Sequence, residues 1–180
     1  MEFQVSRNKL LRLKEMGFRV TWQLIYIGLH DQERINKQIF HDDLFDFLKI
    51  IIDENTDNQD EIVNLLSNEG DEETVDKLLR KFVDYEISSK ELDIRKWRTL
   101  MLVDLLEEIH EKYLTTDPFY SVTLLYDFWL SYFNPNESTD IYPQDSIAFL
   151  ETDVKDIISE NEKWLIKEIK DIILNDGIIQ

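Results

Sequence analysis

The clearest metal-ligand spacing in the chain belongs to Asp53, Asn55 and Asp57, which occupy the first three ligand positions of an EF-hand calcium loop. The pattern fails further along the loop. The sixth position holds Asn58 instead of glycine, and the twelfth holds Asn64 instead of a bidentate glutamate. We therefore do not expect an EF-hand here, and only weak, nonspecific cation binding stays open.

Histidine and glutamate offer a second possible metal chemistry. His30, His41 and His110 lie far apart in the sequence, and none belongs to an HExxH arrangement that would place two ligands on one helix face. Glu107 and His110 have the three-residue spacing of carboxylate-bridged metal sites, but such sites need a second copy, and none is visible. We expect no metal and no cofactor.

Catalytic signatures are missing from the sequence. It contains no nucleophile elbow, no phosphate-binding glycine loop and no dinucleotide fingerprint. The lack of cysteine excludes a cysteine nucleophile, a thiolate metal site and a disulfide. Carboxylates are so abundant that a pair of them carries almost no information about acid–base catalysis. The sequence therefore predicts a protein that is not an enzyme.

An acidic stretch from Asp53 to Asp76 is the most unusual feature of the chain, with ten carboxylates and no lysine or arginine. Asp71, Glu72 and Glu73 have a structural reason to be there, because acidic groups at a helix start interact favourably with the helix dipole. The other interpretations are a partner-binding surface and a set of solvated charges. The candidate partner-binding residues are Asp53, Glu54, Asp57, Asp60, Glu61, Glu69, Glu72, Glu73 and Asp76.

The overall charge indicates which partners the surface favours. Twenty basic and 38 acidic side chains give a formal net charge of −18, which disfavours direct binding of nucleic acids and of anionic membranes and favours a basic protein. The alternative is that the charge only keeps the protein soluble. With no cysteine, no signal peptide and no apolar run long enough for a bilayer, the expected location is the cytoplasm.

Apolar residues recur at three- and four-residue spacing along most of the chain, and only 4 glycines and 3 prolines interrupt it. We predict an all-α fold, a single-domain bundle of about seven or eight helices over residues 1–180. The helix starts are predicted at Ser6, at Thr21, at Ser88 or Ser89, and at Asp117, which is followed by proline. Gly17 and Gly70 are predicted to end helices.

Two segments allow two interpretations each. Residues 119–133 contain too many aromatic side chains for one helix stripe, which favours a helix buried at the centre of a bundle, with a partner groove as the alternative. The N-terminal helix is locally basic, and it either packs near the acidic stretch or presents a solvated face. Its basic residues are Arg7, Lys9, Arg12, Lys14 and Arg19.

A resemblance to a known family is spread over most of the chain. It is carried by Trp22, Trp97, the Asp117 and Pro118 pair, the 126–128 triplet Tyr-Asp-Phe, and Tyr142 followed by proline. In these features the chain resembles a family of small uncharacterised bacterial proteins. Such families are similar to the small, acidic, single-domain immunity proteins encoded beside secreted bacterial toxins. The resemblance implies this role for the chain and implies no catalytic residue.

These observations lead to one expected function and one alternative. The expected function is that of an immunity protein, which binds a cognate bacterial toxin and neutralises it. The toxin would be a nuclease with a basic cleft that the acidic surface occludes. The alternative is a cytosolic helical adaptor or regulatory module that makes protein contacts through an apolar surface and catalyses no reaction. The sequence leaves the oligomeric state open.

Overall fold

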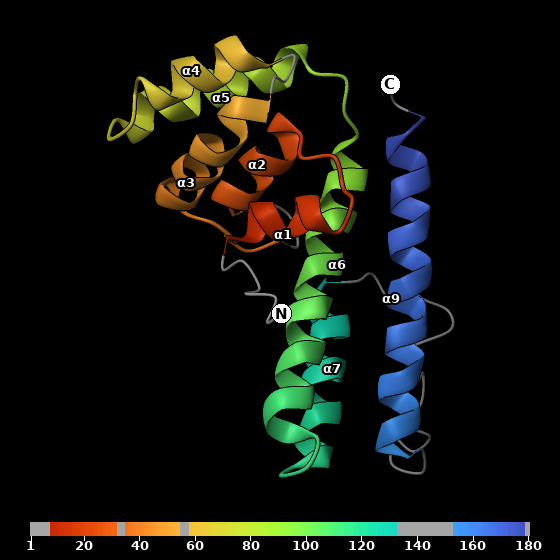
Figure 1. Ribbon diagram of the computed structural model, residues 1–180. Helices are drawn as coiled ribbons and strands as arrows, with labels where there is room; N and C mark the ends of the chain where they lie inside the picture. Colours follow the sequence, from red (N-terminus) through yellow and green to blue (C-terminus); the bar gives the residue numbers. More distant parts are fainter. Residues whose placement is uncertain (1–7, 32–34, 55–57, 133–152, 179–180) are drawn as a thin grey trace. The chain divides into compact units, whose positions relative to one another are not determined.

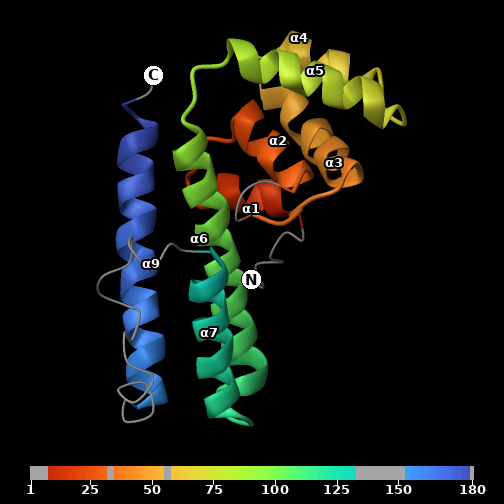
Figure 2. The same ribbon diagram turned by 180° about the vertical axis from the view of Figure 1, so that it is seen from behind.

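A computed structural model describes residues 8–31, 35–54, 58–132 and 153–178, and the chain is all-α over these residues (Figures 1 and 2). They form eight α-helices and no β-strand, which confirms the predicted fold class and number of helices. The α-helices are α1 (Lys9–Glu15), α2 (Trp22–Leu29), α3 (His41–Ile51), α4 (Gln59–Leu66), α5 (Glu72–Tyr85), α6 (Lys90–Glu108), α7 (Pro118–Tyr132) and α9 (Val154–Asp176). A 3₁₀ turn, η1 (Ile52–Glu54), follows α3, and a π-helical turn, η2 (Ile109–Tyr113), follows α6.

Polar side chains at the helix starts accept hydrogen bonds from free backbone N–H groups, as the sequence predicts. Thr21 accepts one from the Leu24 N–H, Ser89 from the Leu92 N–H and Asp117 from the Tyr120 N–H. The prediction for α1 was wrong by two residues, and Ser6 itself lies outside the described residues. Asn8 caps α1 instead, because its side chain accepts from Leu10 N at 3.0 Å and Leu11 N at 3.3 Å.

Two glycines adopt a left-handed backbone conformation. Gly17 has φ +86° just after α1, and Gly70 has φ +94° in the turn between α4 and α5. A side chain at either position would strain the backbone, which accounts for glycine at both. The helix end predicted at Gly17 is confirmed, because Gly17 directly follows the C-cap Met16 of α1. The helix end predicted at Gly70 was wrong by four residues, because α4 ends at Leu66 and a hydrogen-bonded turn separates it from Gly70.

Contacts divide the chain into two compact units. Unit 1 contains Met1–Trp97 with Ile172–Gln180, and unit 2 contains Arg98–Asp171, so that α6 and α9 each contribute residues to both. The prediction of one domain over residues 1–180 stays a prediction. None of the described helices combines the length and apolar character that crossing a bilayer requires.

The core of unit 1 surrounds α2, a short helix with buried residues on nearly every side. α2 packs against α5, while α3 packs against α1 and α4 (Figure 1). Trp97 of α6 is fully buried, and its indole Nε1 donates to the Leu24 carbonyl at 2.8 Å. Gly28 leaves the space for this ring, since a Cβ there would lie 2.4 Å from Cζ2 of Trp97. Trp97 therefore fastens α6 directly to the backbone of α2.

The core of unit 2 is formed by α6, α7 and α9. Trp129 of α7 lies edge-on to Trp164 of α9 with ring centroids 4.9 Å apart, and its Nε1 donates to the Asn161 side chain at 2.7 Å. Phe128 and Trp129 are buried, which confirms the core interpretation for the middle of the aromatic segment. Phe119 at the start of α7 is 73% exposed, so the segment is not buried throughout.

Candidate partner-binding surface

The acidic stretch folds as consecutive short elements of unit 1, namely η1, α4, the turn at 67–71 and the first turns of α5. These elements contact one another, α4 packing against both η1 and α5. The apolar residues Ile62 and Leu65 of α4 and Val75 and Leu79 of α5 are buried. Because these side chains hold one face of each helix in the core, most of the carboxylates lie on the outward faces.

Three of the predicted binding residues have no cation partner among the residues that the structure describes. Asp53 and Asp60 are exposed and Glu61 is half-buried. Within the described ranges, no side chain or backbone group pairs with any of these three carboxylates. Asp57, a fourth member of this part of the set, lies outside the described residues. Asp53, Asp60 and Glu61 therefore carry negative charge that no group in the described part of the chain pairs with.

Three other members form ion pairs at the surface. Glu54 pairs with Lys14 of α1, Glu69 with Lys49 at 2.7 Å, and Glu73 with Lys77 at 2.6 Å. The Lys14 pair shows that the basic N-terminal helix packs near the start of the acidic stretch, one of the two interpretations left open by the sequence. Exposed pairs of this kind contribute little to stability, so a charged partner could compete for these carboxylates.

The last two members, Glu72 and Asp76, face histidines. Asp76 Oδ2 lies 3.1 Å from Nε2 of His30, and Oδ1 lies 3.0 Å from Nε2 of His41. Glu72 Oε2 lies 3.5 Å from Nδ1 of the same His41. Partial burial raises the pKa of Asp76, but the hydrogen bonds from His41 and His30 lower it by more, so the pKa ends below its usual value. Asp76 therefore fastens three helices together in addition to adding negative charge.

The structure thus separates the predicted set into three groups that sequence reasoning could not separate. His30 and His41 were missed as partners of Asp76, because they lie 46 and 35 positions away in the sequence. Asp71, which was not in the binding set, caps α5, and hydrogen bonds from Thr74 hold the pKa of its carboxyl below the usual value. The structural role predicted for a carboxylate at this helix start is confirmed.

The structure offers little for metal binding. Over residues 8–31, 35–54, 58–132 and 153–178, no group of three or more histidine, aspartate or glutamate side chains is arranged to hold a metal ion. His110 Nε2, considered with Glu107 as a possible ligand pair, instead lies 2.9 Å from Glu162 Oε1 of α9. Both members of this contact are nearly half exposed, as expected for a surface pair.

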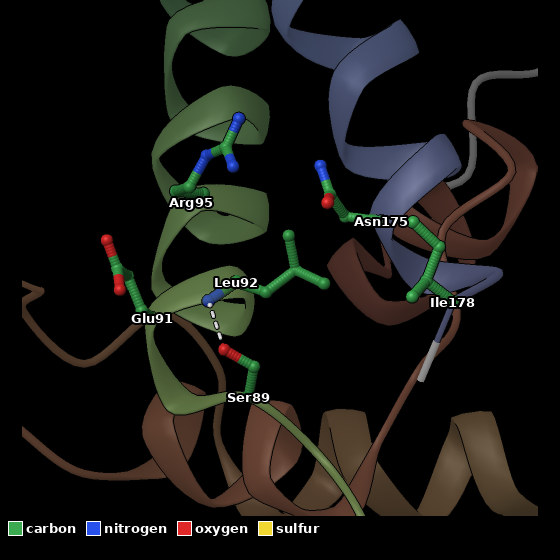
Figure 3. A pocket seen from close by; sticks show the side chains of 6 residues that line it. All are labelled: Ser89, Glu91, Leu92, Arg95, Asn175 and Ile178. Atoms are coloured by element: carbon green, nitrogen blue, oxygen red, sulfur yellow. Dashed lines mark hydrogen bonds between the residues drawn. The ribbon is translucent and has the colours of Figure 1, made fainter. Parts of the chain in front are cut away.

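A hollow of about 230 Å³ opens on unit 1 between the start of α6 and the end of α9 (Figure 3). The Ser89 hydroxyl, which caps α6 by accepting from the Leu92 N–H, lies at its edge. Its remaining polar groups come from two side chains of α6 and one of α9. No base is paired with the hydroxyl among the lining residues, which are Ser89, Glu91, Leu92, Arg95, Asn175 and Ile178. The hollow therefore does not suggest nucleophilic chemistry.

Comparison with known proteins identifies the family. Residues 10–169 match the family described as an uncharacterized protein conserved in bacteria (DUF2247). No curated protein and no solved structure matches the chain. The matched range contains every residue that carries the resemblance found in the sequence, from Trp22 to Pro143. Because the match covers most of its length, the chain belongs to this family of uncharacterised bacterial proteins.

Proposed function

We propose that this protein is an immunity protein, which binds a basic toxin domain and neutralises it by occlusion, without catalysing a reaction. The observation that carries the proposal is the placement of Asp53, Asp60 and Glu61. They lie on η1 and α4, two adjoining elements, and none of them has a cation partner among the described residues. Such a surface attracts a positively charged partner most strongly, because the two charge distributions are complementary.

A nuclease is the toxin that best suits this surface. A nuclease cleft is basic because it holds the phosphates of its substrate, and carboxylates placed in the cleft or at its rim would exclude those phosphates. Opposite charges also accelerate encounter, with association rate constants of up to about 10⁸–10⁹ M⁻¹s⁻¹ at low salt. Rapid capture is what an immunity protein needs when toxin enters the cell.

The acidic residues are proposed to contribute unequally to binding. Asp53, Asp60 and Glu61 are available without breaking an existing contact. Glu54, Glu69 and Glu73 would exchange a lysine of this chain for a cation of the partner. Glu72 and Asp76 remain bound to the histidines and hold α5 in place behind the first group. Asp57 belongs to the proposed set by its position in the sequence.

Capture of a partner from the source bacterium tests the proposal. The bait proteins are the wild type, the triple variant D53K/D60K/E61K, and the control E111K/D127K/D156K, which changes three exposed carboxylates of unit 2 and alters the net charge equally. We expect the wild type and the control to retain one basic protein that salt releases, and the first variant to lose it. The captured protein must also show toxic activity that the wild type suppresses. Equal capture by all three baits would place the interface elsewhere.

The adaptor function is favoured by a different observation. Tyr85 at the end of α5 is 78% exposed, and Ile87 just after it is 75% exposed. Large apolar side chains at the surface are typical anchors of protein contacts. This function predicts a partner that salt does not release and that Y85S/I87S loses. The same capture experiment therefore distinguishes the two proposals.

A further inference from the structure

A small apolar pocket of about 90 Å³ opens on unit 1, where the end of α3 and the start of α4 meet α2. These ends of α3 and α4 adjoin the elements that carry the acidic residues without a cation partner, since η1 follows α3 directly. All the side chains that line the pocket are apolar except Asn58. An apolar hollow thus lies within the region proposed to bind a basic partner.

The inner part of the pocket is formed by side chains that packing already holds in place. Ile25 of α2, Phe47 of α3 and Ile62 of α4 are almost completely buried. Trp22 completes this part, and its ring contacts that of Phe82 with centroids 5.4 Å apart. Because its walls are preformed, the pocket can receive an apolar group without first being opened by a rearrangement.

The rim and the size of the pocket limit what fits. Val20 and Ile51 are half-buried, so this part of the lining reaches solvent. An apolar cavity of roughly 150 Å³ accepts benzene, so a space of about 90 Å³ suits a single aliphatic side chain such as leucine. Asn58, the N-cap of α4, is exposed and makes no capping hydrogen bond through its side chain. Its amide can instead bond the backbone of an incoming peptide segment.

Carboxylates adjoin the pocket on two elements. Asp53 follows the lining residue Ile51 by two positions, and Glu61 directly precedes Ile62. Glu61 also follows Asn58 by three positions, a spacing that places both on one face of α4. Glu61 is half-buried, and across the described ranges no group pairs with it. An occupant that covers the pocket takes more water from this carboxylate, which is unfavourable unless the occupant supplies a cation.

We propose that this pocket receives one leucine-sized aliphatic side chain from a basic protein segment, with a neighbouring lysine or arginine that pairs with Glu61. The proposal rests on the proposed function for its basic partner, and it adds a contact that charge alone does not provide. Opposite charges chiefly accelerate association, whereas a side chain buried in a pocket chiefly slows dissociation. The pocket would therefore give the complex its lifetime, and the carboxylates its speed of formation.

Two peptides that differ in one side chain test the pocket. They are Lys-Lys-Leu-Lys-Lys and Lys-Lys-Ser-Lys-Lys, both acetylated and amidated, so that they carry the same charge. Binding is followed by NMR on protein with ¹³C-labelled isoleucine methyl groups. We expect the leucine peptide to shift the methyl signals of Ile25, Ile51 and Ile62 in a saturable way, and to bind about 10-fold more tightly than the serine peptide.

Variants that fill the pocket serve as the second part of the test. V20F places a ring at the rim and should abolish the preference for leucine, and I51F does the same from α3 in case V20F does not fold. The control V103F adds the same ring at a half-buried valine of unit 2 and should retain the preference. A preference that persists in folded V20F or I51F would overturn the proposal.

The charge requirement is tested with D53K/E61K, which should weaken binding of both peptides. Equal binding of the two peptides to the wild type, lost in D53K/E61K, would overturn the pocket and leave the acidic surface as a binding site. No binding of either peptide would also overturn the pocket, while capture of a basic toxin domain would still support the proposed function. Leucine-peptide binding that is as tight in D53K/E61K as in the wild type would contradict the paired cation.

Discussion

Lys96 Nζ lies 2.7 Å from Asp176 Oδ1 and 3.0 Å from Asp93 Oδ1, and the lysine side chain is fully buried. The ammonium also donates to the Arg19 carbonyl at 2.9 Å, while Asp93 accepts from the Thr21 hydroxyl at 2.6 Å. Every proton of the buried ammonium thus has an acceptor. This cluster ties the last turn of α9 to α6 and to the connection between α1 and α2 within unit 1.

Replacing Lys96 with methionine should strongly destabilise unit 1. The change keeps most of the side-chain volume but leaves Asp93 and Asp176 buried without their cation, a loss of about 3–5 kcal/mol. Urea denaturation followed by circular dichroism measures it. The control is K163M, which removes an exposed lysine paired with Glu160 at 2.6 Å and should change the stability far less than K96M does. Similar losses for both variants would contradict the structural role of the cluster.

Replacing Gly28 with alanine should disturb the packing of Trp97. The new Cβ would lie 2.4 Å from Cζ2 of the buried indole, so ring and helix must separate, at a cost of about 1–3 kcal/mol. Denaturation gives the loss in stability. G177A is the matched control, since the nearest atom to its Cβ is the Leu174 carbonyl oxygen at an ordinary 3.6 Å. If G28A were as stable as the wild type, Trp97 would not pack against α2 at Gly28.

Replacing Glu86 with glutamine should make the protein's stability less dependent on pH. Burial raises the pKa of Glu86 above its ordinary value of 4.5, although its carboxylate accepts from the Gln23 N–H at the start of α2. The folded protein therefore releases this proton at a higher pH than the unfolded chain, and stability falls as the pH rises from 4.5 through the raised pKa. In E86Q the glutamine side chain can still accept this hydrogen bond, but it does not ionise. Its free energy of unfolding, relative to the wild type, should increase across that range. A constant difference would contradict the pKa direction.

Replacing Asn161 with leucine should destabilise unit 2. Asn161 is buried, accepts from the Trp129 indole at 2.7 Å and donates to the Ile157 carbonyl at 2.8 Å. Leucine has a similar size but removes the acceptor of the indole hydrogen bond, at a cost of about 1–3 kcal/mol. Adding W129F removes that donor, so N161L should cost less in a W129F background. Equal costs in both backgrounds would show that the hydrogen bond is not the cause.

The fold was predictable because local signals agree with the packing. Thr21, Ser89 and Asp117 cap helices, and Gly17 ends α1, at positions that local chemistry determines. The start of α1 was misplaced because Ser6 and Asn8 are both good N-caps, and tertiary contacts decide between them. Asn8 also donates to the Asp43 carbonyl of α3 at 2.7 Å, a contact that the sequence cannot reveal.

From the sequence, the candidate surface could be predicted only as a stretch rich in acidic residues. Counting charges identifies residues 53–76 as acidic. It cannot show that Asp53 pairs with no described group, while Asp76 contacts two histidines. Those differences arise from contacts between distant parts of the chain. The buried Lys96 was missed for the same reason, since its partner Asp176 comes from the far end of the sequence.

The most direct test of the proposed function is the association rate constant of the captured toxin domain, measured by stopped flow at low and at high salt. The comparison uses the wild type, D53K/D60K/E61K and the control E111K/D127K/D156K. We expect the wild-type rate to fall steeply with salt, the first variant to associate about 10–100-fold more slowly at low salt, and the control to stay close to the wild type. A rate that depends on neither salt nor the acidic variant would contradict electrostatic capture by this surface.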